Sequence, residues 1–132
     1  MNVDKLKEMY VKYSLTKTDV YKHQHYIIIT RSGIEKVMAV EQIDITYDVI
    51  KMETNFAVIK ATAKKGTKVI ETFGSALKGN SFKDGSTNTW YVAEMAEKRA
   101  LSRATLKMAN LYELGVMGID ESEDFAKSNP HK

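Results

Sequence analysis

The run from Trp90 to Leu114 constrains the fold of this chain most, because it is long, rich in alanine and free of glycine and proline. Such a composition favours a helix, and Gly115 is a residue type that commonly follows the last turn of one. Small or apolar residues fall on one broad stripe of this helix: Ala93, Ala96, Ala100, Ala104, Met108 and Leu111. Since small side chains let a helix lie close to a sheet, we expect a long helix packed on β-structure.

Three segments before this helix have the pattern of β-strands. Residues 43–50 alternate apolar and polar side chains, which indicates a strand with one buried face. Residues 55–63 and 68–75 flank a short connection in which Gly66 suits a tight hairpin turn. Together they predict an antiparallel three-stranded meander. A further, buried strand is expected over 26–30, which is rich in β-branched residues.

Two shorter helices complete the expected fold. Apolar residues recur at helical spacing over 3–13, and Ser32 with Glu35 has the spacing of a capping box before a helix at about 33–41. The polar segments 16–24 and 77–89 are predicted to be loops. We therefore expect an α+β fold. In it, the meander and one further strand pack against the long C-terminal helix and the two short helices.

Length and composition limit the class of protein. A chain of 132 residues forms one domain, which we expect to span residues 1–119. The remainder, 120–132, is acidic and expected to be disordered. No window approaches the roughly 18 uncharged apolar residues that span a bilayer, and the N-terminus lacks the apolar core of a signal peptide. The absence of cysteine excludes disulfides and thiolate chemistry, so a cytoplasmic protein with no membrane partner is expected.

The charge distribution favours a polyanionic partner. The net charge is +3 over the whole chain, but positions 1–119 carry 18 basic and 13 acidic residues. A positive body attracts polyanions through its long-range field. Many proteins carry a similar charge without binding nucleic acid, so the evidence for a nucleic-acid partner has to come from the positions of the basic residues.

Eight basic residues are the candidate nucleic-acid-binding set. Four lie on the predicted long helix: Lys98, Arg99, Arg103 and Lys107. Four lie on the predicted hairpin: Lys60, Lys64, Lys65 and Lys68. Guanidinium groups can bind phosphate with two hydrogen bonds, and a basic hairpin beside a basic helix could line a groove that follows a phosphodiester backbone. The alternatives are a solvated helix face paired with acidic neighbours and lysines that protect a sheet edge.

Nearby aromatic residues allow either a binding or a packing role. Phe82, Trp90 and Tyr91 lie close to the start of the predicted long helix and could stack on bases. Packing in the core is the more common fate of any single aromatic side chain.

The sequence has no recognisable catalytic or metal-binding constellation. His23 and His25 are two residues apart, a spacing that would put them on one face of a strand, but no suitable third ligand follows nearby. The glycines do not form a phosphate-binding loop before a helix. We therefore expect a protein that is not an enzyme and that uses no cofactor and no metal.

One part of the predicted long helix resembles a helix of phage-type single-strand DNA annealing proteins. It is the segment Tyr91-Val-Ala-Glu-Met-Ala-Glu-Lys-Arg-Ala-Leu-Ser-Arg-Ala104, which is followed by Leu-Tyr-Glu-Leu-Gly and an acidic end. It is also similar to the eukaryotic recombination mediator that anneals strands, in which a β-hairpin precedes a helix with a Lys-Arg-Ala signature. Lys98 and Arg99 match the Lys-Arg pair and Arg103 the later basic position, whereas Val92 stands where relatives often have proline. The resemblance implies a β-β-β-α core, rings or filaments of identical subunits, and binding of single strands with their bases free to pair.

The resulting expectation is a protein of a phage or mobile element that binds single-stranded DNA and anneals complementary strands in recombination or repair, without nucleotide hydrolysis. Two alternatives remain open. One is a general module for binding single-stranded DNA or RNA that has no annealing activity. The other is a structural or protein-interaction domain whose charged faces are only solvated.

Overall fold

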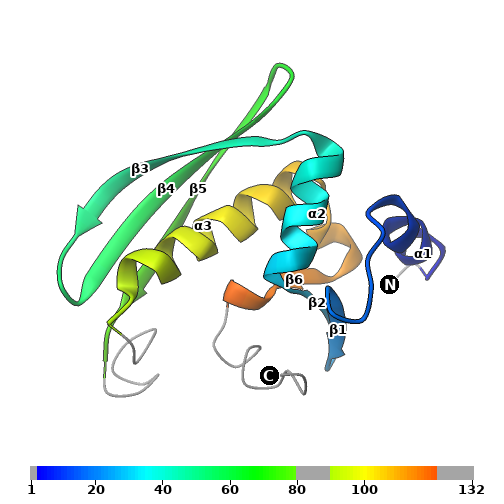
Figure 1. The fold of residues 1–132 in the computed structure, drawn as a ribbon, viewed down its shortest axis with the longest axis horizontal. Helices are drawn as coiled ribbons and strands as arrows, with labels where there is room; N and C mark the ends of the chain where they lie inside the picture. The colour runs from blue at the N-terminus through cyan, green and yellow to red at the C-terminus, as the bar shows by residue number, and fades with distance from the viewer. Residues whose placement is uncertain (1–2, 80–89, 122–132) are drawn as a thin grey trace.

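The computed structural model describes residues 3–79 and 90–121. The helices are α1 (Val3–Lys12), α2 (Arg31–Glu41) and α3 (Val92–Met108). The strands are β1 (Val20–His23), β2 (Tyr26–Ile29), β3 (Asp44–Met52), β4 (Phe56–Lys65), β5 (Lys68–Leu77) and β6 (Val116–Gly118). Two short 3-10 helices, Tyr112–Leu114 and Ile119–Glu121, lie on either side of β6. The α+β class expected from the sequence is confirmed (Figure 1).

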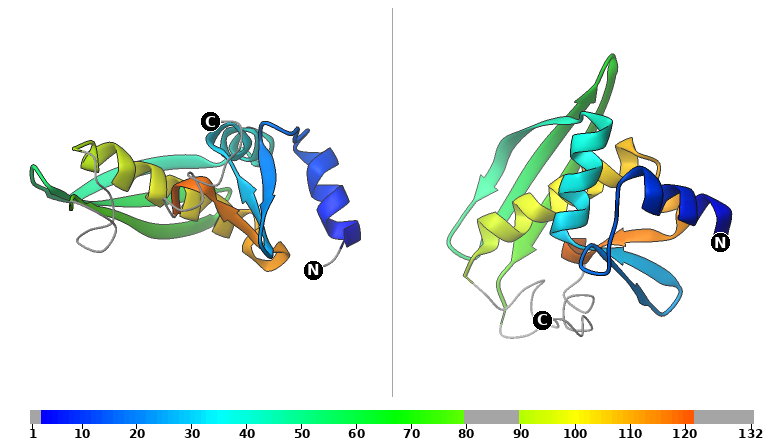
Figure 2. Two further views of the ribbon diagram at one scale, coloured as in Figure 1. Left: turned by 90° about the horizontal axis from the view of Figure 1, so that it is seen from below. Right: turned by 45° about the vertical axis from the view of Figure 1, so that its right-hand side comes forward.

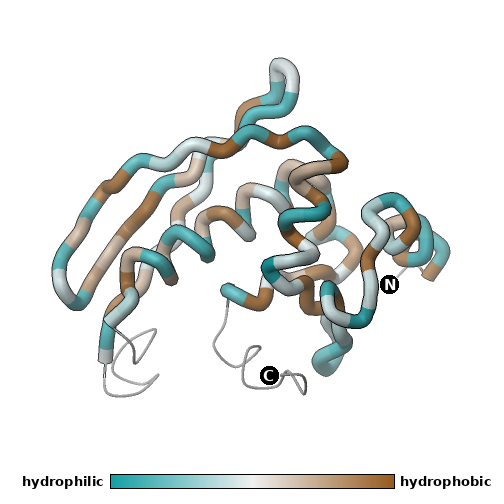
Figure 3. Tube along the Cα trace, in the orientation of Figure 1, coloured by the Kyte–Doolittle hydropathy of each residue, from teal (hydrophilic) through white to brown (hydrophobic). Residues whose placement is uncertain are grey.

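The larger sheet is the predicted antiparallel meander, with strand order β3-β4-β5. Gly66 has a φ of +60° in the turn between β4 and β5, a conformation that glycine adopts without steric cost. Along β4, the side chains on one face are buried, namely those of Ala57, Ile59, Ala61 and Ala63. The alternation of hydrophobic and hydrophilic residues on β3 and β4 is visible in Figure 3. One face of the sheet therefore packs inward, and the other faces solvent.

α3 lies across the inner face of this sheet, against β4 and β5 (Figures 1 and 2). The approach is closest at Gly74, where a Cβ atom would lie 2.1 Å from the carbonyl oxygen of Ala96. The hydroxyl of Thr72 donates a hydrogen bond of 2.8 Å to the carbonyl of Ala100. The predicted stripe of small residues is thus the surface that allows α3 to approach β5. β3, in contrast, has few contacts with α3.

The other side of α3 is buried in a second cluster of apolar residues. Leu101 and Leu106 pack there with residues of α1, α2, β2 and β6. Being buried on two sides, α3 is the centre of the molecule rather than a surface helix.

A small second sheet, with order β1-β2-β6, borders this cluster. β1 and β2 are antiparallel, whereas β2 and β6 are parallel. Only β2 was expected from the sequence, because β1 falls inside the predicted loop 16–24 and β6 follows the predicted long helix.

The end of α3 differs from the expectation. The helix ends at Met108 and not at Leu114, because Asn110 takes a left-handed conformation with a φ of +59°. The amides of Asn110 and Leu111 then donate to the carbonyls of Lys107 and Leu106, which is the Schellman arrangement. Gly115, at a φ of +77°, follows the short 3-10 helix instead.

The capping box expected at the start of α2 is not formed. α2 begins at Arg31 after Thr30, so Ser32 and Glu35 lie inside the helix. The hydroxyl of Ser32 donates to the carboxylate of Asp19 at 2.6 Å, and Glu35 forms an ion pair with Arg31 at 3.3 Å. The buried carboxylate of Asp19, just before β1, therefore takes the hydroxyl of Ser32 that a capping box would use.

The boundary of the expected acidic tail also needs correction. Asp120 and Glu121 belong to a 3-10 helix, and the carboxylate of Glu121 accepts a hydrogen bond of 2.8 Å from the amide of Gly118. The rest of the tail, 122–132, lies outside the described residues, as do 80–89 of the predicted loop. Among the described helices, none combines the length and the apolar character required to cross a bilayer.

Candidate functional site

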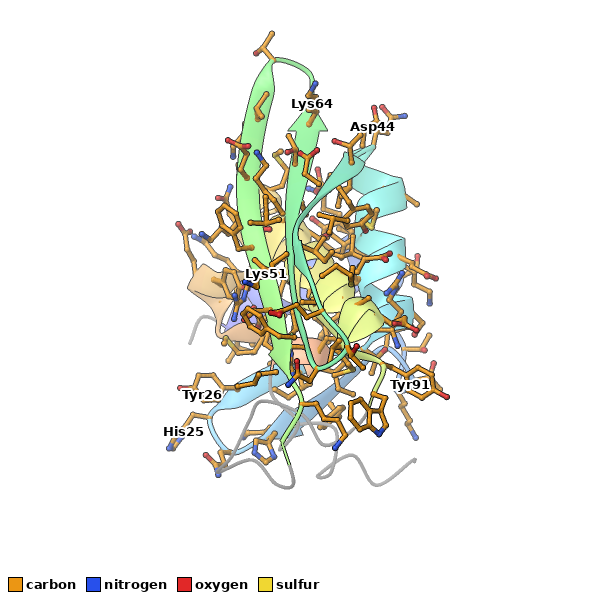
Figure 4. The ribbon with its side chains drawn as sticks, turned by 90° about the vertical axis from the view of Figure 1, so that its left-hand side faces the viewer. His25, Tyr26, Asp44, Lys51, Lys64 and Tyr91 are labelled. Atoms are coloured by element: carbon orange, nitrogen blue, oxygen red, sulfur yellow. The ribbon has the colours of Figure 1, made fainter. Side chains whose placement is uncertain are left out.

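Two hairpin lysines of the candidate set face away from α3. The inner face of β4 carries the buried residues, so Lys60 and Lys64 lie on the outer face. Lys60 forms ion pairs with Glu71 at 2.9 Å and with Asp48 at 3.9 Å. The hydrogen bond and the charge of Glu71 raise the pKa of Lys60. Lys64 is exposed near the hairpin end of the sheet (Figure 4).

Lys65, at the hairpin tip, is bound to the body of the protein. Its ammonium group contacts the carboxylate of Glu41, which also accepts from the hydroxyl of Tyr13 and pairs with Lys12 at 2.8 Å. Burial raises the pKa of Glu41, but the hydrogen bonds from Lys12, Lys65 and Tyr13 outweigh it and hold the pKa at about 2. Lys68 lies opposite Lys65 in the ladder and is exposed.

Arg99 and Arg103 contact the protein itself. Arg99 is only 5% exposed, and its guanidinium donates to the carbonyls of Ser75 at 2.8 Å and Asp120 at 3.0 Å. Arg103 donates to the carbonyl of Phe73 at 2.8 Å and lies 3.8 Å from the carboxylate of Glu121. Arg99 therefore joins α3, β5 and the C-terminal 3-10 helix, in contrast to the expected contact with phosphate.

The remaining helix residues, Lys98 and Lys107, are exposed. Lys107 lies at the end of α3 where Met108 packs near Ala63 and the hairpin. Lys98 lies nearer the start of the helix. The eight candidate residues are thus divided between two faces of the sheet, and Arg99 is enclosed. They do not line the single groove that was expected from the hairpin and the helix.

A different set of exposed groups follows the outer side of α3. Trp90 and Tyr91, directly before the helix, are 63% and 68% exposed, and Figure 4 shows Tyr91 at the opposite end of the sheet from Lys64. The ammonium group of Lys78 lies 4.3 Å from the centre of the Trp90 ring. Lys98 is seven residues after Tyr91, or two helical turns, so it projects from the same side about 10 Å further along.

The positive charges of Arg31 and Lys98 both act on the carboxyl group of Asp120. Burial raises the pKa of Asp120, and the positive charges of Lys98 and Arg31, a hydrogen bond from Ser102 and the charge of Arg99 oppose that rise. The Ser102 hydroxyl lies 3.5 Å from the Asp120 carboxylate. Cations from the start of α2 and from the middle of α3 therefore both act electrostatically on Asp120.

A cavity of about 380 Å³ opens beside the segment that carries Asp120. Its polar lining consists of two cations, three hydroxyls and a phenol: Lys17, Thr18, Tyr21, Thr30, Arg31 and Ser32. Ile119, the residue before Asp120, forms part of its apolar wall. A volume of this size is at the lower end of the range found for small-molecule sites.

We call this combined surface the α3 strip and define it by Trp90, Tyr91, Lys98, Arg31 and the adjoining cavity. It is not uniformly positive, because Glu94 and Glu97 are also exposed on α3. Cations that bind phosphate and aromatic rings that stack on bases are the two elements of a single-strand binding surface.

Sequence reasoning identified three members of the α3 strip, Trp90, Tyr91 and Lys98, but not Arg31. The available signal was the position of Arg31 immediately after the buried strand, where the chain enters a helix. His23 ends β1 and His25 lies in the turn that follows. Over residues 3–79 and 90–121, no three side chains of histidine or acidic type are grouped so that they could hold a metal ion.

Comparison with protein-family models, curated proteins and solved structures gives no significant match to this chain. Support for a function therefore comes from the α3 strip and from the resemblance of its helix motif.

Proposed function

We propose that this protein binds single-stranded DNA through the α3 strip and promotes the annealing of complementary strands in recombination or repair. The activity needs no nucleotide hydrolysis, and we place it in the cytoplasm with a homo-oligomer as the active form. The observation that carries the proposal is that two exposed aromatic rings directly precede α3, that Lys98 lies two turns along from Tyr91, and that the charges of Lys98 and Arg31 both act on Asp120, beside a cavity with hydroxyl groups. The similarity of residues 91–104 to annealing proteins supports the same conclusion.

The mechanism assigns different tasks to the two kinds of side chain. Trp90 and Tyr91 stack on bases, an interaction worth about 1–3 kcal/mol per base. Lys98 and Arg31 neutralise phosphates and release counterions. With the phosphate charge reduced, a complementary strand approaches with less repulsion, and pairing itself supplies the free energy of annealing.

Trp90 is the only tryptophan of the chain, so its fluorescence reports directly on the α3 strip. Titration with a single-stranded oligonucleotide should quench this fluorescence, because a base stacks on the exposed ring. A Trp90→Phe variant, followed by the anisotropy of a labelled oligonucleotide, should keep part of the affinity. Binding by anisotropy with no change in Trp90 fluorescence would show that DNA binds elsewhere.

Salt dependence identifies the cations involved. The logarithm of the binding constant should fall with the logarithm of salt concentration by about 0.7 for each phosphate contacted. Lys98→Ala and Arg31→Ala should each weaken binding and flatten this slope by about 0.7. Lys64→Ala is the matched control, since Lys64 is an exposed lysine on the opposite face of the sheet. Glu97→Gln should tighten binding.

Mixing two complementary labelled oligonucleotides distinguishes annealing from binding alone. Faster duplex formation than in protein-free controls supports the proposal, and unchanged kinetics with intact binding favours a general single-strand module. Equal affinity for an RNA of the same sequence would extend the substrate class. A salt titration with no slope would leave the protein-interaction alternative.

A further inference from the structure

The two outer edges of the large sheet, on β5 and on β3, differ in whether their backbone groups are bound. On the β5 edge, arginines of α3 bind the backbone. The amide of Lys78 donates to the carbonyl of Asn55 at 2.7 Å, so the even-numbered backbone groups of β5 point toward β4. Backbone groups alternate in direction along a strand, and the carbonyls of Phe73 and Ser75 therefore point away from the sheet. These are the two carbonyls that Arg103 and Arg99 bind, each at 2.8 Å. Two outward carbonyls in the middle of the β5 edge are therefore already bound by arginines.

Among the described residues, no comparable contact covers the outer edge of β3. Within residues 3–79 and 90–121, β3 pairs only with β4. The register pairs Asp44, Thr46 and Asp48 with the residues of β4 that point toward β3. The backbone groups of Ile45, Tyr47 and Val49 accordingly point outward. Several apolar side chains on this strand are exposed, with Val49 61% and Ile50 55% exposed. An edge strand of this kind is a template for another strand.

We propose that the outer edge of β3 pairs with the same edge of a second copy of this chain, antiparallel, about a two-fold axis at Tyr47. A β3-to-β5 contact between copies would meet the arginines on the β5 edge, which leaves β3-to-β3 pairing as the way in which copies extend the sheet. The β-bulge between Val49 and Lys51 limits the pairing to residues 45–49.

Charge complementarity selects the antiparallel direction. Asp44 lies at the beginning of β3 and Lys51 toward its end (Figure 4). In the antiparallel arrangement about Tyr47, Asp44 lies just before the paired segment 45–49 and Lys51 just after it, so these opposite charges of the two copies meet at each end of the contact. Ile45 lies opposite Val49 of the second copy, and Asp48 lies opposite Thr46. A parallel arrangement would set like charges side by side, which is unfavourable.

This contact uses one surface per chain and therefore produces a closed dimer. Assembly into a larger ring or filament requires a further surface. The dimer does not depend on nucleic acid, so its test is separate from that of the proposed function.

Because the chain has no cysteine, Tyr47→Cys introduces a single thiol at the axis. Paired Cα atoms in a hydrogen-bonded antiparallel pair are about 5.5 Å apart, inside the range of about 4.4–6.8 Å that a disulfide spans. Mild oxidation at micromolar concentration should produce a covalent dimer that reductant reverses. Phe73→Cys, 52% exposed on β5, is the matched control and should remain uncrosslinked.

Sedimentation gives a second readout without chemistry. The wild type should sediment at twice 15.0 kDa or as a multiple of that dimer, and Val49→Lys should halve the mass. Val69→Lys, a similar valine that is 54% exposed on β5, should leave it unchanged. A wild type that is monomeric at tens of micromolar overturns the proposal, and so does crosslinking through Phe73→Cys in preference to Tyr47→Cys. An assembly whose mass Val49→Lys does not change also overturns it.

Discussion

Replacing Arg99 with alanine should destabilise the whole protein, although arginine is usually a surface residue. The guanidinium is enclosed between α3, β5 and the C-terminal 3-10 helix, where it donates to two backbone carbonyls. A hydrogen bond that involves a charged group contributes about 1.5–3 kcal/mol. Loss of both bonds, with partial hydration of the freed carbonyls, should lower the free energy of unfolding by about 3–5 kcal/mol.

Urea unfolding followed by circular dichroism measures this loss, and the melting temperature should fall by about 12–20 °C. Arg99→Lys should lie between alanine and the wild type, because an ammonium group cannot reach both carbonyls in the fork geometry of a guanidinium. Lys98→Ala is the matched control. Its side chain is exposed, so stability should change by less than about 0.5 kcal/mol, while DNA binding weakens.

The two neighbouring variants therefore separate a structural from a binding role. A loss below about 1 kcal/mol in Arg99→Ala, with an unchanged denaturant slope, would refute the structural role assigned to Arg99. The same conclusion would follow if Arg99→Ala remained fully folded and lost only its DNA affinity.

Two further predictions concern stability. Gly74→Ala places a Cβ atom 2.1 Å from the Ala96 carbonyl and should cost about 3 kcal/mol or more in urea unfolding, whereas Ser75→Ala on the outer face should cost little. Burial raises the pKa of Asp19, but hydrogen bonds from Lys36, Ser32 and Thr16 outweigh this effect and lower the pKa from its ordinary 3.8 to about 2. The stability that the ionised Asp19 carboxylate contributes should thus be complete above pH 4 and lost as pH falls from about 4 to about 2. Asp19→Asn should therefore unfold at lower urea than the wild type at pH 7 and at the same urea concentration near pH 2. A constant difference in stability across that range would contradict this role.

The larger sheet and α3 could be predicted from the sequence because their signals are local. The alternation over 43–50, the glycine between two strand-like segments and the alanine stripe each repeat with the period of the element they form. The same signals fixed which face of β4 and which stripe of α3 are buried.

The small sheet could not be predicted in this way. β1 and β6 have four and three residues, too few for a period to emerge. β6 is extended because its residues pair with Ile27, Ile28 and Ile29 of β2. The prediction of a capping box at Ser32 was wrong for a related reason, since the carboxylate of Asp19, thirteen residues earlier, accepts from the Ser32 hydroxyl.

The candidate site shows the same limit for charged residues. A basic side chain on a helix is expected at the surface, and nothing local to Arg99 indicates that two carbonyls from distant segments surround it. Nothing local to Arg31 indicates its role, because its link to Lys98 runs through Asp120, on which both charges act only in the folded structure. Trp90, Tyr91 and Lys98 were accessible to prediction because they need no partner to be exposed.

The parallel pairing of β2 with β6 has a consequence for synthesis on the ribosome. β2 emerges early, and its apolar residues remain without their neighbour until Val116 to Gly118 leave the exit tunnel. During that interval a nascent chain presents an isoleucine-rich strand that other nascent chains can bind, so chaperone dependence should last until Val116 to Gly118 have emerged. A chain held back before Val116 would still pair β1 with β2, but the other edge of β2 would stay open.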